Sequence, residues 1–498
     1  MRQLLLSFIL FTCAYTVAHA QIATIELNVR NAKNDDVTIS IPINHNYFAG
    51  NERHAKISNS GTLSIPLKED ETGPITIKVL DKKAFLYVQK GNSIKISLDT
   101  ANKTNPWQFE GSNATGQHFL TENFLPKGRY VSPIMYEGYQ YLTDSAAVDV
   151  EEKINRRRLS TFAEEEKLFN QFQIDTTFFN YLKISTNYYF AGITAYAIVH
   201  QFRKQELPKN HKLYQSSLPS DFEALWHKTY QLYPPNSFSA TQMLWVFDYY
   251  YTYLVKYKHY LIKKSGQNPP SERENDDLKR IGNTINSEFK DHAAEYALAN
   301  IIYSDANSKL YQSALIELFN DFKRQFPYSK YAPLIQPLIE DVIAFQIKAK
   351  AKYASGEKIG SKYSQINTLK ELTDQFKGKT ILIDTWATWC GPCKAEFQYT
   401  KELKKFLNEK DVTMLYISID EDKYDTRWKE MIKYYELEGT HVRANKELQN
   451  DINKLIWDGN GYSVPTYIII DKQGNIAEKK AYRPSQKELL FEQISKHL

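Results

Sequence analysis

Apolar and polar residues alternate along the first part of the chain. Ile25, Leu27 and Val29 show this spacing clearly, because a polar residue separates each of them from the next. A period of two is typical of strands with one buried face, and clusters of Asn, Asp, Ser and Gly separate its repeats as turns would. The pattern predicts an antiparallel β sandwich or barrel over residues 21–112.

Beyond this region the apolar residues recur every three or four positions. Phe247, Tyr250 and Leu254 lie on one helical face at this spacing. Prolines at intervals mark the ends of successive helices, so we predict an all-α helical domain over residues 113–352. Its tyrosine-rich faces are expected to pack in the core, with a groove for a peptide or glycan as the alternative.

A polar, glycine-bearing segment over residues 353–362 is predicted to be a linker. After it, strand patterns alternate with helical patterns, which is typical of an α/β layer fold over residues 363–498. The expected strands are residues 380–385, 412–419, 466–470 and 476–480, and the expected helices are residues 369–376, 393–408, 425–437 and 485–497.

Length and composition set the broad class. A chain of 498 residues is too long for one compact core and predicts a multidomain protein. With 24% charged residues, 35 Tyr and 26 Phe, the composition is that of a folded protein and not of a disordered or fibrous one. The formal net charge of +5 is small for this length and no basic cluster stands out, so no nucleic acid is expected as a partner.

Residues 1–20 have the three parts of a secretory signal peptide. Arg2 precedes an apolar stretch over residues 4–11, and an Ala-His-Ala cleavage site ends at Ala20. We therefore expect export to the periplasm. The segment that ends at Cys13 also loosely resembles a bacterial lipobox. Lipidation of Cys13 is the alternative, and it would give an outer-membrane or cell-surface lipoprotein with weak membrane association.

Removal of the signal peptide would leave two cysteines, both in the segment Trp389-Cys390-Gly391-Pro392-Cys393. This pair closes so small a loop that it adds little stability by loop entropy, so its value is chemical. Cys390 follows a predicted strand and begins a predicted helix, whose free N–H groups and dipole favour a thiolate. Cys393, one turn further on, is placed to attack a mixed disulfide formed at Cys390.

Residues 384–394 closely resemble the active-site segment of the thioredoxin superfamily, and residues 464–466 resemble the cis-proline loop of that family. The resemblance implies a thioredoxin-like fold for residues 363–498. The sequence after residue 417, with an extra helical stretch, is similar to the exported TlpA/ResA-like branch. The arrangement of the whole chain resembles secreted thiol:disulfide oxidoreductases of Bacteroidetes-type bacteria.

This resemblance implies three catalytic residues. Cys390 would be the nucleophile and Cys393 the resolving thiol. Asp384 would be the buried acid that helps to deprotonate Cys393, unless it lies at a solvated strand end. Glu396 is interpreted as a charge on the helix surface.

The resemblance also implies the residues that surround the cysteines. Trp389 would shape the rim of the site. Val464 and cis-Pro465 would receive the substrate strand, and Gly391 with Pro392 would tune the redox potential.

Three departures from the family pattern stand near the site. Gln398 replaces a proline that kinks the helix in the family, which predicts a straighter helix. Tyr416 stands roughly where thioredoxin has a lysine beside the buried acid. Tyr482 lies near a position that is glycine in thioredoxin, which predicts a narrower specificity.

Other chemistries fit less well. A peroxiredoxin needs a threonine and a proline at the positions of Ala387 and Ile383. A zinc site needs two more ligands, and His441 is isolated in a polar stretch, so neither a metal nor another cofactor is expected. A non-enzymatic alternative remains, in which residues 22–350 form a surface binding module for a peptide or glycan and the thioredoxin-like domain is an accessory.

The direction of electron flow follows from the dipeptide between the cysteines. Gly391-Pro392 is that of reducing thioredoxins, whose potential is about -270 mV. It favours reduction of disulfides in exported proteins over the alternatives, oxidation or isomerisation. A reductant in an oxidising compartment must itself be re-reduced, which predicts a membrane electron donor of the DsbD or CcdA type as a partner.

Overall fold

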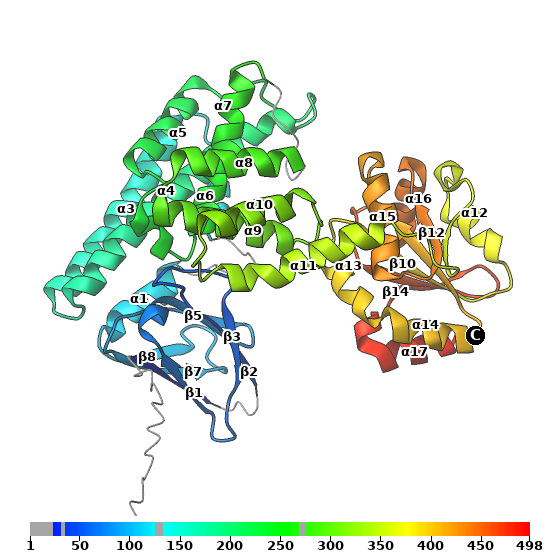
Figure 1. Ribbon diagram of the computed structural model, residues 1–498, viewed down its shortest axis with the longest axis horizontal. Helices are drawn as coiled ribbons and strands as arrows, with labels where there is room; N and C mark the ends of the chain where they lie inside the picture. Colours follow the sequence, from blue (N-terminus) through cyan, green and yellow to red (C-terminus); the bar gives the residue numbers. More distant parts are fainter. Residues whose placement is uncertain (1–22, 31–34, 125–132, 268–274) are drawn as a thin grey trace, which may run out of the picture. The chain divides into compact units, whose positions relative to one another are not determined.

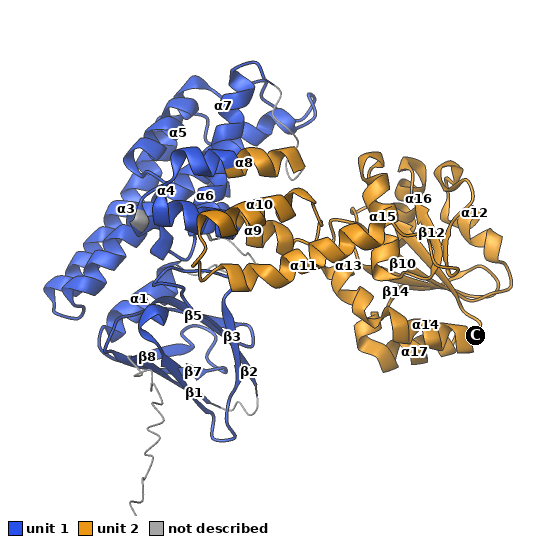
Figure 2. Cartoon of the chain, viewed as in Figure 1, with its two compact units in different colours: residues 1–269, 283–300 blue, residues 270–282, 301–498 orange. Residues whose placement is uncertain are grey.

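The computed structural model describes residues 23–30, 35–124, 133–267 and 275–498. The expected signal peptide and Cys13 lie outside these residues. Contacts divide the chain into two compact units, Met1–Pro269 with Asn283–Asn300 and Pro270–Gly282 with Ile301–Leu498 (Figure 2). None of the helices described in these ranges has both the length and the apolarity needed to cross a membrane.

The described residues of the first unit begin with two four-stranded sheets, in the orders β4-β1-β7-β8 and β3-β2-β5-β6 (Figure 1). Their strands are β1 (Ala23–Arg30), β2 (Asp36–Ser40), β3 (Glu52–Lys56), β4 (Thr62–Leu67), β5 (Gly73–Val79), β6 (Lys82–Val88), β7 (Ser93–Asp99) and β8 (Trp107–Gly111). Apolar side chains of both sheets, such as Ile25 and Ile39, share one core. The period-two pattern therefore located the buried faces.

One strand pair departs from the antiparallel sheet that the sequence predicted. β1 and β7 are parallel, whereas the other pairs in these two sheets are antiparallel. A parallel pair needs a long connection, and strands β2 to β6 provide it here. The alternation of residues cannot reveal this, because it is the same in both kinds of pair.

Helices make up the rest of the first unit. They are α1 (Ala114–Phe124), α2 (Pro133–Tyr139), α3 (Ala147–Asn170), α4 (Thr176–Arg203), α5 (Ser220–Leu232), α6 (Val246–Tyr251), the π-helix η4 (Thr252–Tyr257) and α7 (Lys258–Lys264). Tyr188, Tyr189, Tyr249 and Tyr250 are buried in this unit. These tyrosines therefore pack in a core and do not line an open groove.

The division between the units falls within α8 (Asn275–Glu288) and α9 (Asp291–Asn307). The second unit continues with α10 (Ala314–Gln325) and α11 (Ala332–Ala349). The domain boundaries predicted near residues 112 and 352 rest on the sequence pattern and stay predictions.

The remainder of the second unit is an α/β layer fold around one six-stranded sheet, in the order β14-β13-β10-β11-β12-β9 (Figure 1). The strands are β9 (Glu357–Ile359), β10 (Ile381–Trp386), β11 (Thr413–Ser418), β12 (Gly439–Arg443), β13 (Thr466–Ile470) and β14 (Ile476–Ala481). β9 to β12 pair in parallel, and β13 and β14 are antiparallel to their neighbours. One core lies on each face of this sheet.

The helices of this fold are α12 (Leu369–Thr373), α13 (Gly391–Glu396), α14 (Thr400–Glu409), α15 (Asp425–Tyr435), α16 (Lys446–Trp457) and α17 (Lys487–Ser495). α12 and α16 contribute to the core on one face, and α14 and α17 contribute to the core on the other.

Two sequence predictions are corrected here. The segment predicted to be a linker contains β9, which pairs with β12. The segment predicted as one helix over residues 393–408 is not a continuous α-helix, because a 3-10 turn at Phe397–Tyr399 separates α13 from α14. The absence of proline at Gln398 therefore does not make this helix continuous.

Candidate active site

The strand β10 leads directly to the two cysteines. All six of its residues are buried, as expected for a central strand. The loop after it is held by Asp420, whose carboxylate accepts the Thr388 N–H at 2.9 Å and the Thr388 hydroxyl at 2.8 Å. The Ser418 hydroxyl donates a further hydrogen bond to Asp420 at 2.7 Å. Asp420 thus fixes the loop that precedes Cys390.

Cys390 and Cys393 are joined by a disulfide, with their Cα atoms 5.3 Å apart. Cys390 is the N-cap of α13, and its sulfur accepts the Cys393 N–H at 3.1 Å. Cys390 is 3% exposed and Cys393 is fully buried, so an incoming disulfide reaches Cys390 first. Trp389 is 53% exposed and stands at the surface next to it.

Asp384 is buried in β10, 2% exposed, and is not at a solvated strand end. Its neighbours across the sheet are Tyr416 on β11 and Tyr467 on β13. Burial raises the pKa of Asp384 to about 8. Its Oδ1 atom has no hydrogen-bond partner in the described part of the chain. A carboxyl group in this state can exchange a proton close to neutral pH.

Tyr416 occupies the place beside Asp384 where the resemblance implied a lysine. Its ring stacks on that of His441, with the ring centroids 4.6 Å apart. Burial lowers the pKa of His441 to about 4, and its Nε2 lies 2.6 Å from the Leu437 carbonyl oxygen. On this side, Asp384 therefore has a neutral aromatic neighbour.

Glu396 was interpreted as a surface charge, and this was wrong. Its side chain is buried and accepts hydrogen bonds from the N–H and the hydroxyl of Ser485, at 2.9 and 3.0 Å. It joins α13 to the turn before α17, and its charge adds to the effect of burial in raising the pKa of Asp384.

The cis-proline loop lies beside the end of β10. The Val464–Pro465 peptide bond is cis. Thr385 holds the next residue in place, because its hydroxyl bonds the carbonyl oxygen of Thr466 at 2.9 Å and accepts the Thr466 N–H at 3.2 Å. A cavity of about 230 Å³ opens against Pro465.

Lys394 is a residue of the site that the sequence analysis did not single out. Its buried ammonium group donates hydrogen bonds to the carbonyl oxygens of Thr388, Ser308 and Lys309, at 3.1, 2.7 and 3.2 Å. It therefore ties the active-site loop to the turn after α9. Only its place beside Cys393 could have drawn attention to it.

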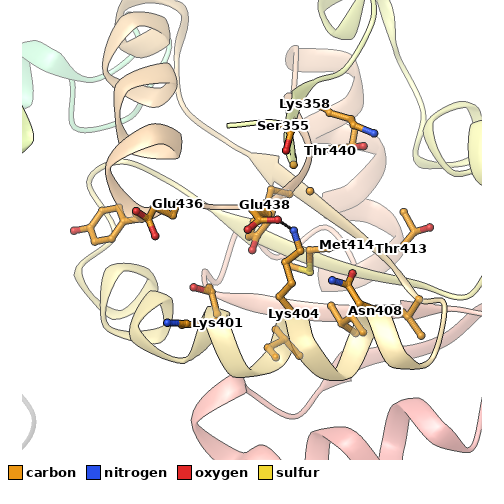
Figure 3. A pocket seen from close by; sticks show the side chains of 18 residues that line it. Ser355, Lys358, Lys401, Lys404, Asn408, Thr413, Met414, Glu436, Glu438 and Thr440 are labelled. Atoms are coloured by element: carbon orange, nitrogen blue, oxygen red, sulfur yellow. Dashed lines mark ion pairs between the residues drawn. The ribbon is translucent and has the colours of Figure 1, made fainter. Parts of the chain in front are cut away.

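A larger cavity, of about 390 Å³, lies against α14, β11 and β12. Figure 3 shows the side chains that line it and the ion pair of Lys404 with Glu438. Neither cysteine lines this cavity, so it is not where the disulfide reacts. In the described ranges, no cluster of three or more His, Cys, Asp or Glu side chains is arranged to hold a metal ion.

Comparison with known proteins agrees with this geometry. The family model described as Redoxin matches residues 354–490. The thiol-disulfide oxidoreductase ResA of Bacillus cereus is 35% identical over 109 residues, which are 22% of this chain and 58% of the relative. ResA of Geobacillus thermodenitrificans is 29% identical over 105 residues, 21% of this chain and 55% of the relative. The chain thus spans little more than half the length of the curated relatives that it matches.

Solved structures also match the C-terminal region. The thioredoxin domain of a thiol-disulfide oxidoreductase from Bacteroides vulgatus is 24% identical, with 25% of this chain and 81% of that chain covered and a TM-score of 0.21. A thiol:disulfide interchange protein from Chlorobium tepidum is 23% identical, with 25% and 83% covered and a TM-score of 0.22. Residues 354–490 therefore carry a Redoxin domain, and this region is similar to the thiol-disulfide oxidoreductases named ResA.

Proposed function

We propose that the protein is an exported thiol:disulfide oxidoreductase that reduces disulfides in periplasmic proteins. The observation that carries this proposal is the disulfide between Cys390 and Cys393, in which the more exposed sulfur caps α13. The cis-Pro465 loop lies beside β10, the strand that leads to this pair, and the buried Asp384 is a residue of that strand. Together they supply a nucleophile, a resolving thiol, a place for the substrate strand and a proton acceptor.

The reaction begins with both cysteines reduced. The Cys390 thiolate attacks one sulfur of the substrate disulfide, that bond breaks, and the leaving sulfur takes up a proton. Cys393 then gives its proton to Asp384 and attacks the sulfur of Cys390. The mixed disulfide breaks, and the second substrate sulfur leaves and is protonated. The substrate gains two electrons and two protons, and Cys390 and Cys393 become the disulfide.

The pKa values suit this proton transfer. A free thiol has a pKa of about 8.5, and burial places that of Asp384 at about 8. With a pKa of about 8, a fraction of Asp384 is ionised at neutral pH, and this fraction can accept the proton of Cys393.

The oxidised protein must be reduced again before it can act on a second substrate. A membrane electron donor of the DsbD or CcdA type would supply two electrons through its own dithiol. Export is supported by the sequence of residues 1–20 and by the likeness to ResA. Lipid at Cys13 would place the same chemistry on a membrane surface.

A trapping experiment tests the proposed function. In a Cys393→Ala variant expressed with its export signal, the mixed disulfide at Cys390 cannot be resolved, so exported proteins should remain attached through Cys390 and be released by dithiothreitol. The double variant Cys390→Ser, Cys393→Ala is the matched control and should trap none. Absence of any trapped protein in the single variant would refute the proposal.

A further inference from the structure

The cavity of about 230 Å³ beside Pro465 is the feature that the proposed reaction does not yet use. It lies between the cis-proline turn, the end of β14 and the end of α16. The residues that line it are Trp457, Ser463, Pro465, Thr466, Tyr467, Lys480, Ala481 and Arg483.

The position of this cavity ties it to the redox site. Thr466 in its wall is hydrogen-bonded to Thr385, near the end of the strand that leads to Cys390. Tyr467 pairs with Asp384 on one side and with Ala481 on the other. A substrate strand lying along the cis-proline turn would point its successive side chains to opposite faces. A side chain close to the reacting cysteine of the substrate would then enter the cavity.

Two cations line this cavity, Lys480 and Arg483, and both are exposed. Within the described ranges, neither has an ion pair with a carboxylate of the chain. The neighbouring Lys479 differs, because it pairs with Asp458 at 3.8 Å and does not line the cavity. Two unpaired cations at one small cavity attract a carboxylate, and the attraction is stronger there than in open water.

The inner wall of the cavity is complementary to the apolar part of an acidic side chain. Trp457 and Tyr467 line the cavity and are both buried. The rings of Trp457 and Tyr467 provide apolar surface for the methylene groups of a glutamate side chain.

We propose that this cavity is a substrate subsite that binds an acidic side chain, glutamate or aspartate, close to the reacting disulfide. Lys480 and Arg483 select the acid, and substrates with an acidic residue near the reacting cysteine are reduced faster than neutral ones. The inference rests on the proposed function, since it names the class of disulfide that the same site prefers.

The test uses matched peptides in which one cysteine is joined by a disulfide to a small thiol. They differ only near that cysteine, where they carry Glu, Gln, Lys or Phe. The full mature chain reduces them with dithiothreitol as the final electron donor, and kcat/KM is measured for each. We expect the Glu peptide to be preferred over the Gln peptide by about 5- to 10-fold, and more strongly at low ionic strength.

Substitutions in the cavity test whether the preference for the Glu peptide depends on its residues. Lys480→Gln with Arg483→Gln should lower kcat/KM for the Glu peptide until the Glu and Gln peptides are reduced equally well. Lys479→Gln is the matched control and should keep the preference. Circular dichroism of each variant checks that it is folded.

Three other outcomes would each contradict either the subsite or the proposed function. A preference for Glu that persists in the double variant would place acid recognition elsewhere and refute this subsite. A peptide with Phe that is preferred over the one with Glu would make the cavity an apolar subsite and also refute it. Failure of the unmodified chain to reduce any of the peptides would instead count against the proposed function.

Discussion

Asp384 and Asp420 are two buried carboxyl groups beside the same active-site loop, and they have opposite surroundings. Asp420 accepts hydrogen bonds from the N–H and the hydroxyl of Thr388 and from the hydroxyl of Ser418. Asp384 has an oxygen without such a partner and lies between two tyrosines in the sheet. Burial raises the pKa of both groups, but at Asp420 the hydrogen bonds from Ser418 and Thr388 act against this rise. Asp420 is thus bound to the loop by its carboxylate, whereas Asp384 keeps an oxygen free to take up a proton.

A third carboxyl group shows that a raised pKa alone does not indicate catalysis. Burial raises the pKa of Glu165 in α3 to about 8, as it does for Asp384. The partner of Glu165 is the hydroxyl of Thr186, and neither cysteine belongs to the unit in which it lies. Asp384 differs because it lies in the strand that leads to Cys390, where a raised pKa can serve catalysis.

Removal of the carboxyl group of Asp384 should have the largest effect. Asp384→Asn cannot accept the proton of Cys393, so release of the second substrate thiol at pH 7 should slow about 100-fold, the lower end of the range for general acid–base catalysis. Rapid-mixing kinetics with the reduced protein measure this step. Glu165→Gln is the control and should keep the normal rate. If this rate fell by less than about threefold in Asp384→Asn, Asp384 would have no more part in proton transfer than Glu165.

Asp420→Asn should act on stability more than on proton transfer. The amide offers one acceptor oxygen where the carboxylate offers two, and its NH₂ group cannot accept the Thr388 hydrogen bonds. We expect a loss of about 1.5–3 kcal/mol, the usual range for a hydrogen bond to a charged group. Urea unfolding of the full chain, followed by tryptophan fluorescence, would show it as a lower midpoint. An unchanged midpoint would mean that Asp420 does not hold the loop.

The stability of the second unit should depend on pH through Asp384. Burial raises its pKa from the ordinary value of 3.8 to about 8, so the folded state holds a proton that the unfolded chain releases. The contribution of Asp384 to stability is therefore greatest below pH 4. It falls as the pH rises to about 8, by at most about 1.4 kcal/mol per pH unit, and is constant above that pH. The Asp384→Asn variant should lack this fall between pH 5 and 8. Parallel curves for the two proteins in urea would contradict the expectation.

Lys394→Met should have the smallest effect of these changes. Lys394 holds the carbonyl oxygen of Thr388, while Asp420 holds the N–H of the same residue. The loop would keep the Asp420 contacts, so we expect a loss of about 1 kcal/mol in the same urea experiment. Because both residues act on Thr388, the double variant with Asp420→Asn should deviate from additivity by about 0.5 kcal/mol or more. Strict additivity would show that the two contacts are independent.

The sequence alone was enough to predict those parts of the fold and the site that depend on a short local pattern. The apolar run of β10 and the spacing of the cysteines pointed to a strand, a loop and a helix, and all three are present. The resemblance implied that Asp384 is a buried acid, with a solvated strand end as the alternative, and the side chain is buried in β10. Period-two alternation located the buried faces of the N-terminal strands, because burial of one face imposes that period.

Local sequence patterns could not predict contacts between residues that are far apart along the chain. Glu396 is buried because Ser485 lies against it, 89 positions later in the chain. The carbonyl oxygens that hold Lys394 are 86 and 85 positions before it. The short strand β9 exists because β12 pairs with it, so its polar sequence resembled a linker.

The equilibrium potential of the Cys390–Cys393 pair tests the central claim most directly. The full mature chain would be brought to equilibrium with reduced and oxidised glutathione, and the fraction of the pair that is oxidised would be measured by thiol alkylation. The proposed reductase should have a potential near that of thioredoxin, about -270 mV. A potential near about -120 mV, that of a strong disulfide-forming oxidant, would contradict it.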